Sequence, residues 1–498
     1  MLLDDFPRGV TTRNLNEHRT PLAAWARPED IAVAPALNYD PTKIFLGKID
    51  GTAIGLADDR HMMTVAGSRA GKGVSAIVPN LIMYQGSVLA IDPKAELASI
   101  TARRRAEGLG QRVCVLDPFN RAAPWVEPYR ASYNPLSILK TDSPTLVEDA
   151  GLISDALVVA GGNDPHWDDS ARNFIEGLIL HVATYPGHEE QRNLVTVRRL
   201  LMNGTHMEQG DQEADGMDGL HVQMLHNVEL QSEDGRAPIS EAIEAAAADF
   251  FDKPSTERGS VLSTARRHTK FLDFPSIQAV LTGHDFDLTD LKTAPGGMTV
   301  YLCLPAARLA TCSRWFRLFV NLALDAMERE AAKPKVPVLL CLDEFATLGH
   351  MRQIEAAAGQ IAGFGVKLWP ILQDLTQLKR DYKEGWETFL GNAGVIQFFG
   401  NNDTTTLEYI SKRLGKTSIM VNRGAQTTHD QRTKGASGTS WATEVHDLIT
   451  AEEAGRMFGR DDRLRRQLVI RAGRDPMVIE RALYHDDALF AGKYDKWG

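Results

Sequence analysis

One glycine-rich turn constrains the fold of this chain more than any other feature of its sequence. Residues 66–73 (AGSRAGKG) follow the apolar run MMTVA and open a helical segment. Such a turn aims backbone N–H groups at one point, at the positive end of a helix, where phosphate oxygens bind. The match to the P-loop pattern G-x-x-x-x-G-K-[ST] is incomplete, because Ala66 replaces a glycine and Gly73 replaces the hydroxyl residue. A glycine-rich turn with a solvated lysine is the alternative interpretation.

The P-loop interpretation assigns a defined set of contacts. Backbone N–H groups of the turn would hold phosphate oxygens, and the ammonium group of Lys72 would contact the β and γ phosphates. The expected nucleotide-binding residues are Gly67, Ser68, Arg69, Ala70, Gly71, Lys72, Gly73 and Val74.

A second motif lies at the end of a strand far along the chain. Residues 336–344 (VPVLLCLDE) form an apolar run that ends in Asp343 and Glu344. In an open parallel sheet, ligands bind at the carboxyl ends of the strands. Asp343 can hold magnesium there, and Glu344 can polarise the attacking water as general base. Asp92 also ends an apolar strand, but it lacks the adjacent second acid, so Asp343 is preferred.

The strand that follows the acidic pair ends in a third candidate. Residues 366–373 (VKLWPILQ) place Gln373 at the end of an apolar run. Its side-chain amide can touch the γ phosphate or the attacking water. A helix-capping or solvated glutamine fits the position equally well.

The apolar runs alternate with amphipathic segments, and this alternation predicts a parallel sheet covered by helices on both faces. The predicted strands are 62–66, 87–92, 112–117, 298–304, 336–343, 366–372 and 394–399. Between them, helical runs dominate one long interval. We therefore expect an extended arm at 1–43, a nucleotide-binding domain in two parts at 44–143 and 273–498, and an inserted all-helical domain at 144–272. Residues 417–446, rich in Thr, Ser, Gly and Asn, suggest a long hairpin or a mobile arm.

Charge and cysteine content exclude several classes of protein. The net charge of −10 argues against a basic surface that wraps duplex DNA. The cysteines Cys114, Cys303, Cys312 and Cys341 contain no CxxC pair and are expected to be buried, reduced and cytosolic. The uncharged stretch between Lys72 and Asp92 is interrupted by Pro79 and Gly86. No transmembrane helix is predicted.

These motifs together resemble the TraG-type coupling ATPases of conjugation and type IV secretion. The resemblance runs from about Ile44 to Tyr494 and rests on GSRAGKGVSAIVPNLI, LAIDPKAEL, VCVLDPF, HWDDSARNFIEGLIL, TVYLCLP, LLCLDEFATLGHM, AGFGVKLWPILQDLTQLKRDY and LITAEEAGRMF. It implies an α/β fold with a RecA-like P-loop NTPase core, a mainly parallel sheet and an inserted all-alpha domain. It also implies use of ATP with Mg²⁺ by a homo-hexamer, at the interfaces between subunits.

The resemblance also implies individual roles. Lys72 would be the phosphate lysine, Asp343 and Glu344 the acidic pair, and Gln373 the sensor. Because Gly73 carries no hydroxyl, Ser75 or water would complete the magnesium coordination. An arginine from a neighbouring subunit could stabilise the charge on the γ phosphate. The candidates for it are Arg60, which is otherwise a surface arginine, and, more weakly, Arg413.

The function implied is the recruitment and energised transfer of a relaxase-bound single DNA strand or a protein effector into a type IV secretion channel. Relatives usually begin with membrane-spanning helices, so this chain is either naturally unanchored or truncated. We expect it in the cytoplasm, peripheral to the inner membrane through channel components. Two alternatives stay open: a nucleotide-dependent docking adaptor with little hydrolysis, and a chromosome-type translocase of duplex DNA. A motor, unlike an adaptor, should be stimulated by single-stranded DNA.

Overall fold

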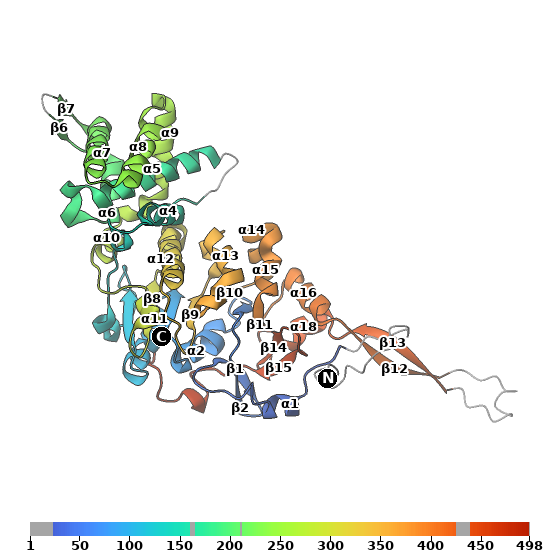
Figure 1. The fold of residues 1–498 in the computed structure, drawn as a ribbon. Helices are drawn as coiled ribbons and strands as arrows, with labels where there is room; N and C mark the ends of the chain where they lie inside the picture. Colours follow the sequence, from blue (N-terminus) through green and yellow to red (C-terminus); the bar gives the residue numbers. More distant parts are fainter. Residues whose placement is uncertain (1–22, 160–164, 210–211, 425–438, 498) are drawn as a thin grey trace, which may run out of the picture.

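A large twisted sheet forms the body of the molecule (Figure 1). The computed structural model describes residues 23–159, 165–209, 212–424 and 439–497. In these ranges one sheet of eleven strands has the order β2-β1-β15-β14-β11-β3-β10-β9-β4-β8-β5. The strands from β11 to β5 are parallel to one another. They comprise β3 (His61–Ala66), β4 (Val88–Asp92), β5 (Arg112–Leu116), β8 (Met298–Cys303), β9 (Val338–Leu342), β10 (Val366–Leu372) and β11 (Ala393–Phe399).

These parallel strands coincide with the seven apolar runs predicted from the sequence, and the α/β class is confirmed. Four further strands extend the sheet beyond β11 in antiparallel pairs and were not predicted. They are β1 (Ile44–Ile49), β2 (Thr52–Leu56), β14 (Arg466–Arg471) and β15 (Met477–Glu480). Polar residues within them, such as Lys48, Gln467 and Arg466, interrupt the apolar runs that mark a fully buried strand.

Both faces of the parallel strands are buried, which explains their nearly continuous apolar sequences. In β4, Leu89 and Ile91 belong to the hydrophobic core on one face, whereas Val88 and Ala90 belong to the core on the other. Successive side chains of a strand point to opposite faces, so both sets must be apolar. All four cysteines are free and buried in the folded chain.

Helices cover the sheet and continue into a separate helical unit. Those associated with the sheet include α1 (Pro28–Val33), η1 (Gly73–Ile77), α2 (Val78–Met83), α3 (Glu96–Arg103), α12 (Leu309–Arg329), α13 (Arg352–Gln360), α14 (Leu375–Tyr382), α15 (Trp386–Gly391), α16 (Thr404–Leu414) and α18 (Ala451–Met457). Side-chain caps define several of their starts. Thr450 and Glu453, for example, form a reciprocal capping box at the start of α18.

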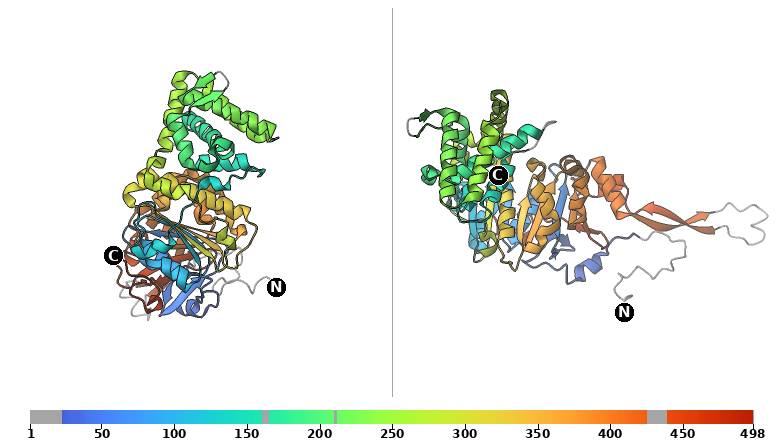
Figure 2. Two further views of the ribbon diagram at one scale, coloured as in Figure 1. Left: turned by 90° about the vertical axis from the view of Figure 1, so that its left-hand side faces the viewer. Right: turned by 45° about the horizontal axis from the view of Figure 1, so that its top comes forward.

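The helical unit stands at one end of the sheet, above α12 (Figures 1 and 2). The predicted interval 144–272 contains α4 (Leu146–Leu157), α5 (Pro165–Thr184), α6 (Leu194–Asn203), α7 (Gly216–Glu233), α8 (Ala237–Phe251) and α9 (Ser255–His268). It also contains a short hairpin of β6 (Met207–Gln209) and β7 (Gln212–Ala214), and α10 (Pro275–Thr282) follows it. The core of this unit is continuous with the core on one face of the sheet.

A second projection leaves the opposite side of the molecule (Figure 1). The strands β12 (Lys416–Gly424) and β13 (Thr439–Asp447) pair antiparallel, as expected of a long hairpin, and residues 425–438 lie outside the described residues. Most of the predicted N-terminal arm, residues 1–22, also lies outside them. None of the helices in the described ranges combines the length and apolar character that crossing a membrane requires.

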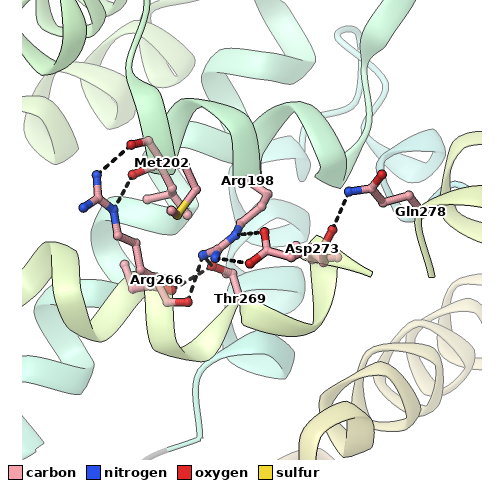
Figure 3. A network of polar contacts seen from close by, with 9 residues as sticks. Arg198, Met202, Arg266, Thr269, Asp273 and Gln278 are labelled. Atoms are coloured by element: carbon pink, nitrogen blue, oxygen red, sulfur yellow. Dashed lines mark hydrogen bonds and ion pairs between the residues drawn. The ribbon is translucent and has the colours of Figure 1, made fainter. Parts of the chain in front are cut away.

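A buried arginine ties three segments together where the helical unit meets the rest of the chain (Figure 3). Arg198 of α6 donates through Nε and Nη2 to the two carboxylate oxygens of Asp273, at 2.7 and 2.6 Å. Its Nη1 donates to the Arg266 carbonyl and the Thr269 hydroxyl. Arg266 in turn donates to the carbonyls of Leu201 and Met202 in the last turn of α6. The guanidinium groups therefore hold α6 against α9 and the following turn.

Replacement of Arg198 by alanine is expected to loosen this connection. It leaves Asp273, the Arg266 carbonyl and the buried Thr269 hydroxyl without their donor, at a cost of about 2 kcal/mol in local stability. Hydrogen exchange measured by mass spectrometry would show faster exchange in α6 and α9. The matched control is Arg199→Ala, because Arg199 is the next residue and is exposed. Equal protection in both variants would contradict the structural role of Arg198.

Candidate nucleotide-binding site

The sequence motifs converge at one edge of the sheet. Strands β3, β10, β9 and β4 are neighbours in that order, and they are parallel. Their carboxyl ends therefore bring the P-loop, Gln373, the acidic pair and Asp92 to the same edge. A cleft of about 290 Å³ opens there, lined by Ser68, Arg69, Gly71, Lys72, Gly73, Val74, Val78, Asp92, Pro93, Lys94, Glu96, Leu97, Asp343, Glu344 and Gln373.

The P-loop adopts a conformation that depends on glycine. Gly71 has φ +89°, and a side chain on Gly67 would place its Cβ 1.9 Å from the carbonyl oxygen of Gly400. Arg69 also has a positive φ, of 57°. The chain then enters η1 at Gly73, and the first N–H groups of a helix have no acceptor within it. The loop thus presents free donors to the cleft, as expected of a phosphate site.

Lys72 and the acidic pair form the charged centre of the cleft. The Lys72 ammonium lies 2.7 Å from Glu344 Oε1 and 3.4 Å from Asp343 Oδ1. Gln373 donates through Nε2 to the other Glu344 oxygen, Oε2, at 3.2 Å. The backbone N–H of Glu344 donates to Asp343 Oδ1, and Glu344 has a positive φ of 53°. Four side chains from three separate strand ends are therefore in direct contact.

Burial and pairing shift the ionisation of this centre in a consistent way. Burial opposes the charged form of Lys72, but Asp343 and Glu344 outweigh it and raise the pKa of Lys72 above its usual value. Burial also raises the pKa of Asp343, and the Lys72 ammonium offsets only part of that rise. Lys72 is therefore positively charged at neutral pH. A further cation next to Asp343 would stabilise the charged form of its carboxylate.

Asp92 plays a different part from Asp343. Its carboxylate is buried and accepts hydrogen bonds from the backbone N–H groups of Glu96 at 3.0 Å and Ala98 at 2.9 Å. Burial raises the pKa of Asp92 to about 7. Asp92 thus organises the start of α3, whereas Asp343 directly contacts the P-loop lysine.

Some predicted site residues lie elsewhere. Ser75 is buried, its hydroxyl donates to the Gly71 carbonyl at 2.8 Å, and it does not line the cleft. Arg60 lies at the opposite end of β3, about 20 Å along the strand from the P-loop, and pairs with both carboxylate oxygens of Asp58. Arg413 is exposed on α16. The structure therefore brings Lys72, Asp343, Glu344 and Gln373 together, but not Ser75, Arg60 or Arg413.

Two residues that support the cleft were not predicted from the sequence. Arg481, at the end of the unpredicted β15, donates to the Ala70 carbonyl at 2.6 Å, and its guanidinium lies over the Phe399 ring. Asn401 donates to the Gln373 carbonyl at 3.2 Å. Arg481 thus supports the P-loop, and Asn401 supports the backbone of Gln373. No local pattern marks them, because their partners come from distant parts of the chain.

A metal ion in this cleft would depend on the nucleotide for part of its coordination. Across the described part of the chain, no three His, Cys, Asp or Glu side chains converge to hold a metal ion by themselves. Mg²⁺ commonly binds through one or two carboxylates together with phosphate oxygens and water. Asp343, partly exposed to the cleft and 3.4 Å from the Lys72 ammonium, fits that requirement.

The sequence of this chain is similar to a family of known proteins over most of its length. The family described as type IV secretory system conjugative DNA transfer matches residues 23–496. A conjugal transfer protein TraG of Escherichia coli is 26% identical, over 96% of this chain and 78% of that protein. The type IV secretion system-coupling protein VirD4 of Bartonella henselae is 24% identical, over 85% of this chain and 62% of its own length.

Solved structures show the same fold. The bacterial conjugative coupling protein TrwB, in a trigonal form with sulphate, superposes with a TM-score of 0.64 at 13% identity, covering 93% of this chain and 96% of that one. TrwB in complex with ADP and Mg²⁺ gives a TM-score of 0.57 at 14% identity, covering 85% of each chain.

Proposed function

Because the chain belongs to the type IV secretory family of conjugative DNA transfer proteins, we propose that it hydrolyses ATP in this cleft to drive substrate transfer. The family match favours a coupling protein over the docking adaptor and the duplex translocase considered from the sequence. We propose ATP as the nucleotide, its hydrolysis as the reaction, and the residues of the cleft described above as the site.

One observation carries the proposal. Lys72 of the P-loop contacts both Asp343 and Glu344, and Gln373 contacts Glu344, within a cleft at the ligand-binding edge of the sheet. A phosphate-binding lysine, a metal-binding carboxylate and a general base are the parts that P-loop hydrolysis requires. The TrwB complexes with ADP and Mg²⁺ and with an ATP analogue support nucleotide binding by this fold.

In the proposed mechanism, the triphosphate displaces Glu344 from Lys72. The ammonium of Lys72 then neutralises phosphate charge, while Glu344 becomes free to accept a proton from the attacking water. Gln373 holds the second Glu344 oxygen and thereby fixes the direction of the first. The backbone N–H groups of Ser68, Arg69, Gly71 and Gly73 bind the phosphate oxygens.

Asp343 is the residue that would hold Mg²⁺, with phosphate oxygens and water in place of the hydroxyl that Gly73 lacks. The ion would supply neutralisation of the charge on the β and γ phosphates. Because Ser75 is buried and does not line the cleft, we assign the remaining coordination to water and not to Ser75.

The family also suggests the partners of this chain. We propose a homo-hexamer, peripheral to the inner membrane, that receives a relaxase-bound single strand or a protein effector and passes it to channel components. Arg60 remains the candidate for a contribution to a neighbouring subunit's nucleotide, because it lies far from its own chain's cleft.

The test is ATP turnover by the purified chain with and without single-stranded DNA. A motor should be stimulated, and the stimulation should weaken as salt concentration rises, because cationic groups hold the phosphate backbone. Electron-microscope projections with an ATP analogue should show six-fold rings. An ATP turnover rate that does not change with single-stranded DNA, together with persistent monomers, would instead indicate an adaptor.

A further inference from the structure

The turn that follows β4 forms a wall of the cleft for which the mechanism above has no role. Pro93 and Lys94 of this turn, and Glu96 at the start of α3, line the cleft together with the P-loop and the acidic pair. Strand β4 lies beside β9, so the turn begins next to Asp343 and Glu344. In the strand order β3-β10-β9-β4, it is the part of the cleft farthest from the P-loop strand.

This turn is held in an energetically costly conformation. Asp92, the last residue of β4, has a buried carboxylate that accepts hydrogen bonds from the backbone N–H groups of Glu96 and Ala98. Ala95 adopts a left-handed conformation with φ 56°. A non-glycine residue in that region costs about 1–3 kcal/mol, and such strain gathers at functional sites. The turn therefore fixes the backbone of Lys94, the residue between Pro93 and Ala95, at the cleft.

Lys94 differs from Lys72 in its partners. The Lys72 ammonium is engaged by both carboxylates of the acidic pair. Within the part of the chain that the structure describes, the exposed Lys94 ammonium makes no hydrogen bond or ion pair. Arg69 also lines the cleft, but it belongs to the P-loop side. A flexible lysine with three free donors is suited to meet an incoming phosphate as a mobile point charge.

We propose that Lys94 is a second phosphate-contacting lysine, whose ammonium binds the terminal phosphate of the nucleotide. This inference rests on the proposed function. In this arrangement the phosphate chain would begin at the P-loop, pass Lys72 and Glu344 and end toward the turn after β4, because β4 is the next strand beyond β9 and Lys94 lines the cleft there. The terminal phosphate adds negative charge beside Asp343, Glu344 and Glu96, and the cation on this wall offsets it.

The experiment compares Lys94→Gln, Lys94→Arg and Lys335→Gln. Lys335 is an exposed lysine just before β9, at the opposite edge of the sheet, so its replacement makes the same charge change away from the cleft. Affinity for a non-hydrolysable ATP analogue and for ADP, each with Mg²⁺, is measured by displacement of a fluorescent nucleotide. Thermal melting checks that all variants fold.

Lys94→Gln is expected to weaken binding of the triphosphate analogue about tenfold, as for loss of one charge-assisted contact. Binding of ADP should change much less, and Lys94→Arg should recover most of the affinity. Parent-like affinity of Lys94→Gln for the analogue overturns the inference and leaves the proposed function standing. Equal losses for ADP and the analogue, or an equal loss in Lys335→Gln, also overturn it. If the parent binds neither nucleotide, the proposed function fails as well.

Discussion

Glu344→Gln is expected to lower ATP turnover about 10³-fold, because the amide cannot accept a proton from the attacking water. Nucleotide binding should survive and become tighter. The substitution removes a negative charge beside the phosphates and weakens the contact that holds the Lys72 ammonium at 2.7 Å. Steady-state phosphate release and equilibrium binding of an ATP analogue would measure the two effects separately.

The matched control for this variant is Glu241→Gln, which makes the same change at an exposed residue of α8. It should hydrolyse ATP like the parent. If Glu344→Gln also retains parental turnover, then Glu344 is not the general base. If it loses turnover only because it no longer binds nucleotide, the role of Glu344 is in binding and the proposed mechanism is wrong.

Lys72→Ala should abolish turnover for a different reason. The variant loses the cation that neutralises the phosphates, and we expect kcat/KM to fall about 10³-fold with much weaker binding of the ATP analogue. It also leaves Asp343 and Glu344 without a counter-charge, so their repulsion should raise the pKa of Asp343 further. Titration calorimetry with the analogue would measure the loss of affinity.

A second substitution separates charge from geometry at this position. Lys72→Arg keeps a positive charge for Asp343 and Glu344 and should preserve thermal stability, yet the bulkier guanidinium should not restore turnover. Lys335→Ala serves as the control for loss of a lysine elsewhere. Parental turnover in Lys72→Ala would exclude the P-loop assignment, whatever the nucleotide affinity.

The two variants together distinguish binding from chemistry. The predicted pattern is tight binding without turnover for Glu344→Gln, and weak binding without turnover for Lys72→Ala. A cleft used only for nucleotide-dependent docking would give the same binding results, but the parent itself would then show little turnover.

Much of the fold could be predicted because its signals are local. A strand buried on both faces must be apolar throughout, so β3, β4, β5, β8, β9, β10 and β11 were visible as apolar runs. The P-loop was visible because its backbone requires glycine at the tight contact of Gly67 with Gly400 and at the positive φ of Gly71. The acidic pair was visible because it ends an apolar strand.

Other features depended on partners that no local pattern reveals. Ser75 follows the P-loop at a plausible spacing for a metal ligand, yet in the folded chain it is buried and does not line the cleft. The antiparallel strands β1, β2, β14 and β15 carry polar residues and gave no strong apolar signal. Arg481 reaches Ala70 across 411 positions of sequence.

The sequence by itself determined the parallel core, and it predicted a helical interval and the candidate site residues Lys72, Asp343, Glu344 and Gln373. These depend on which side chains a buried strand or a tight turn tolerates. Only the tertiary structure decided that Lys72 and Glu344, 272 positions apart, are in contact, and that Lys94 lines their cleft. The order of the strands in the large sheet sets those distances, and that order results from pairing strands that are far apart in the sequence.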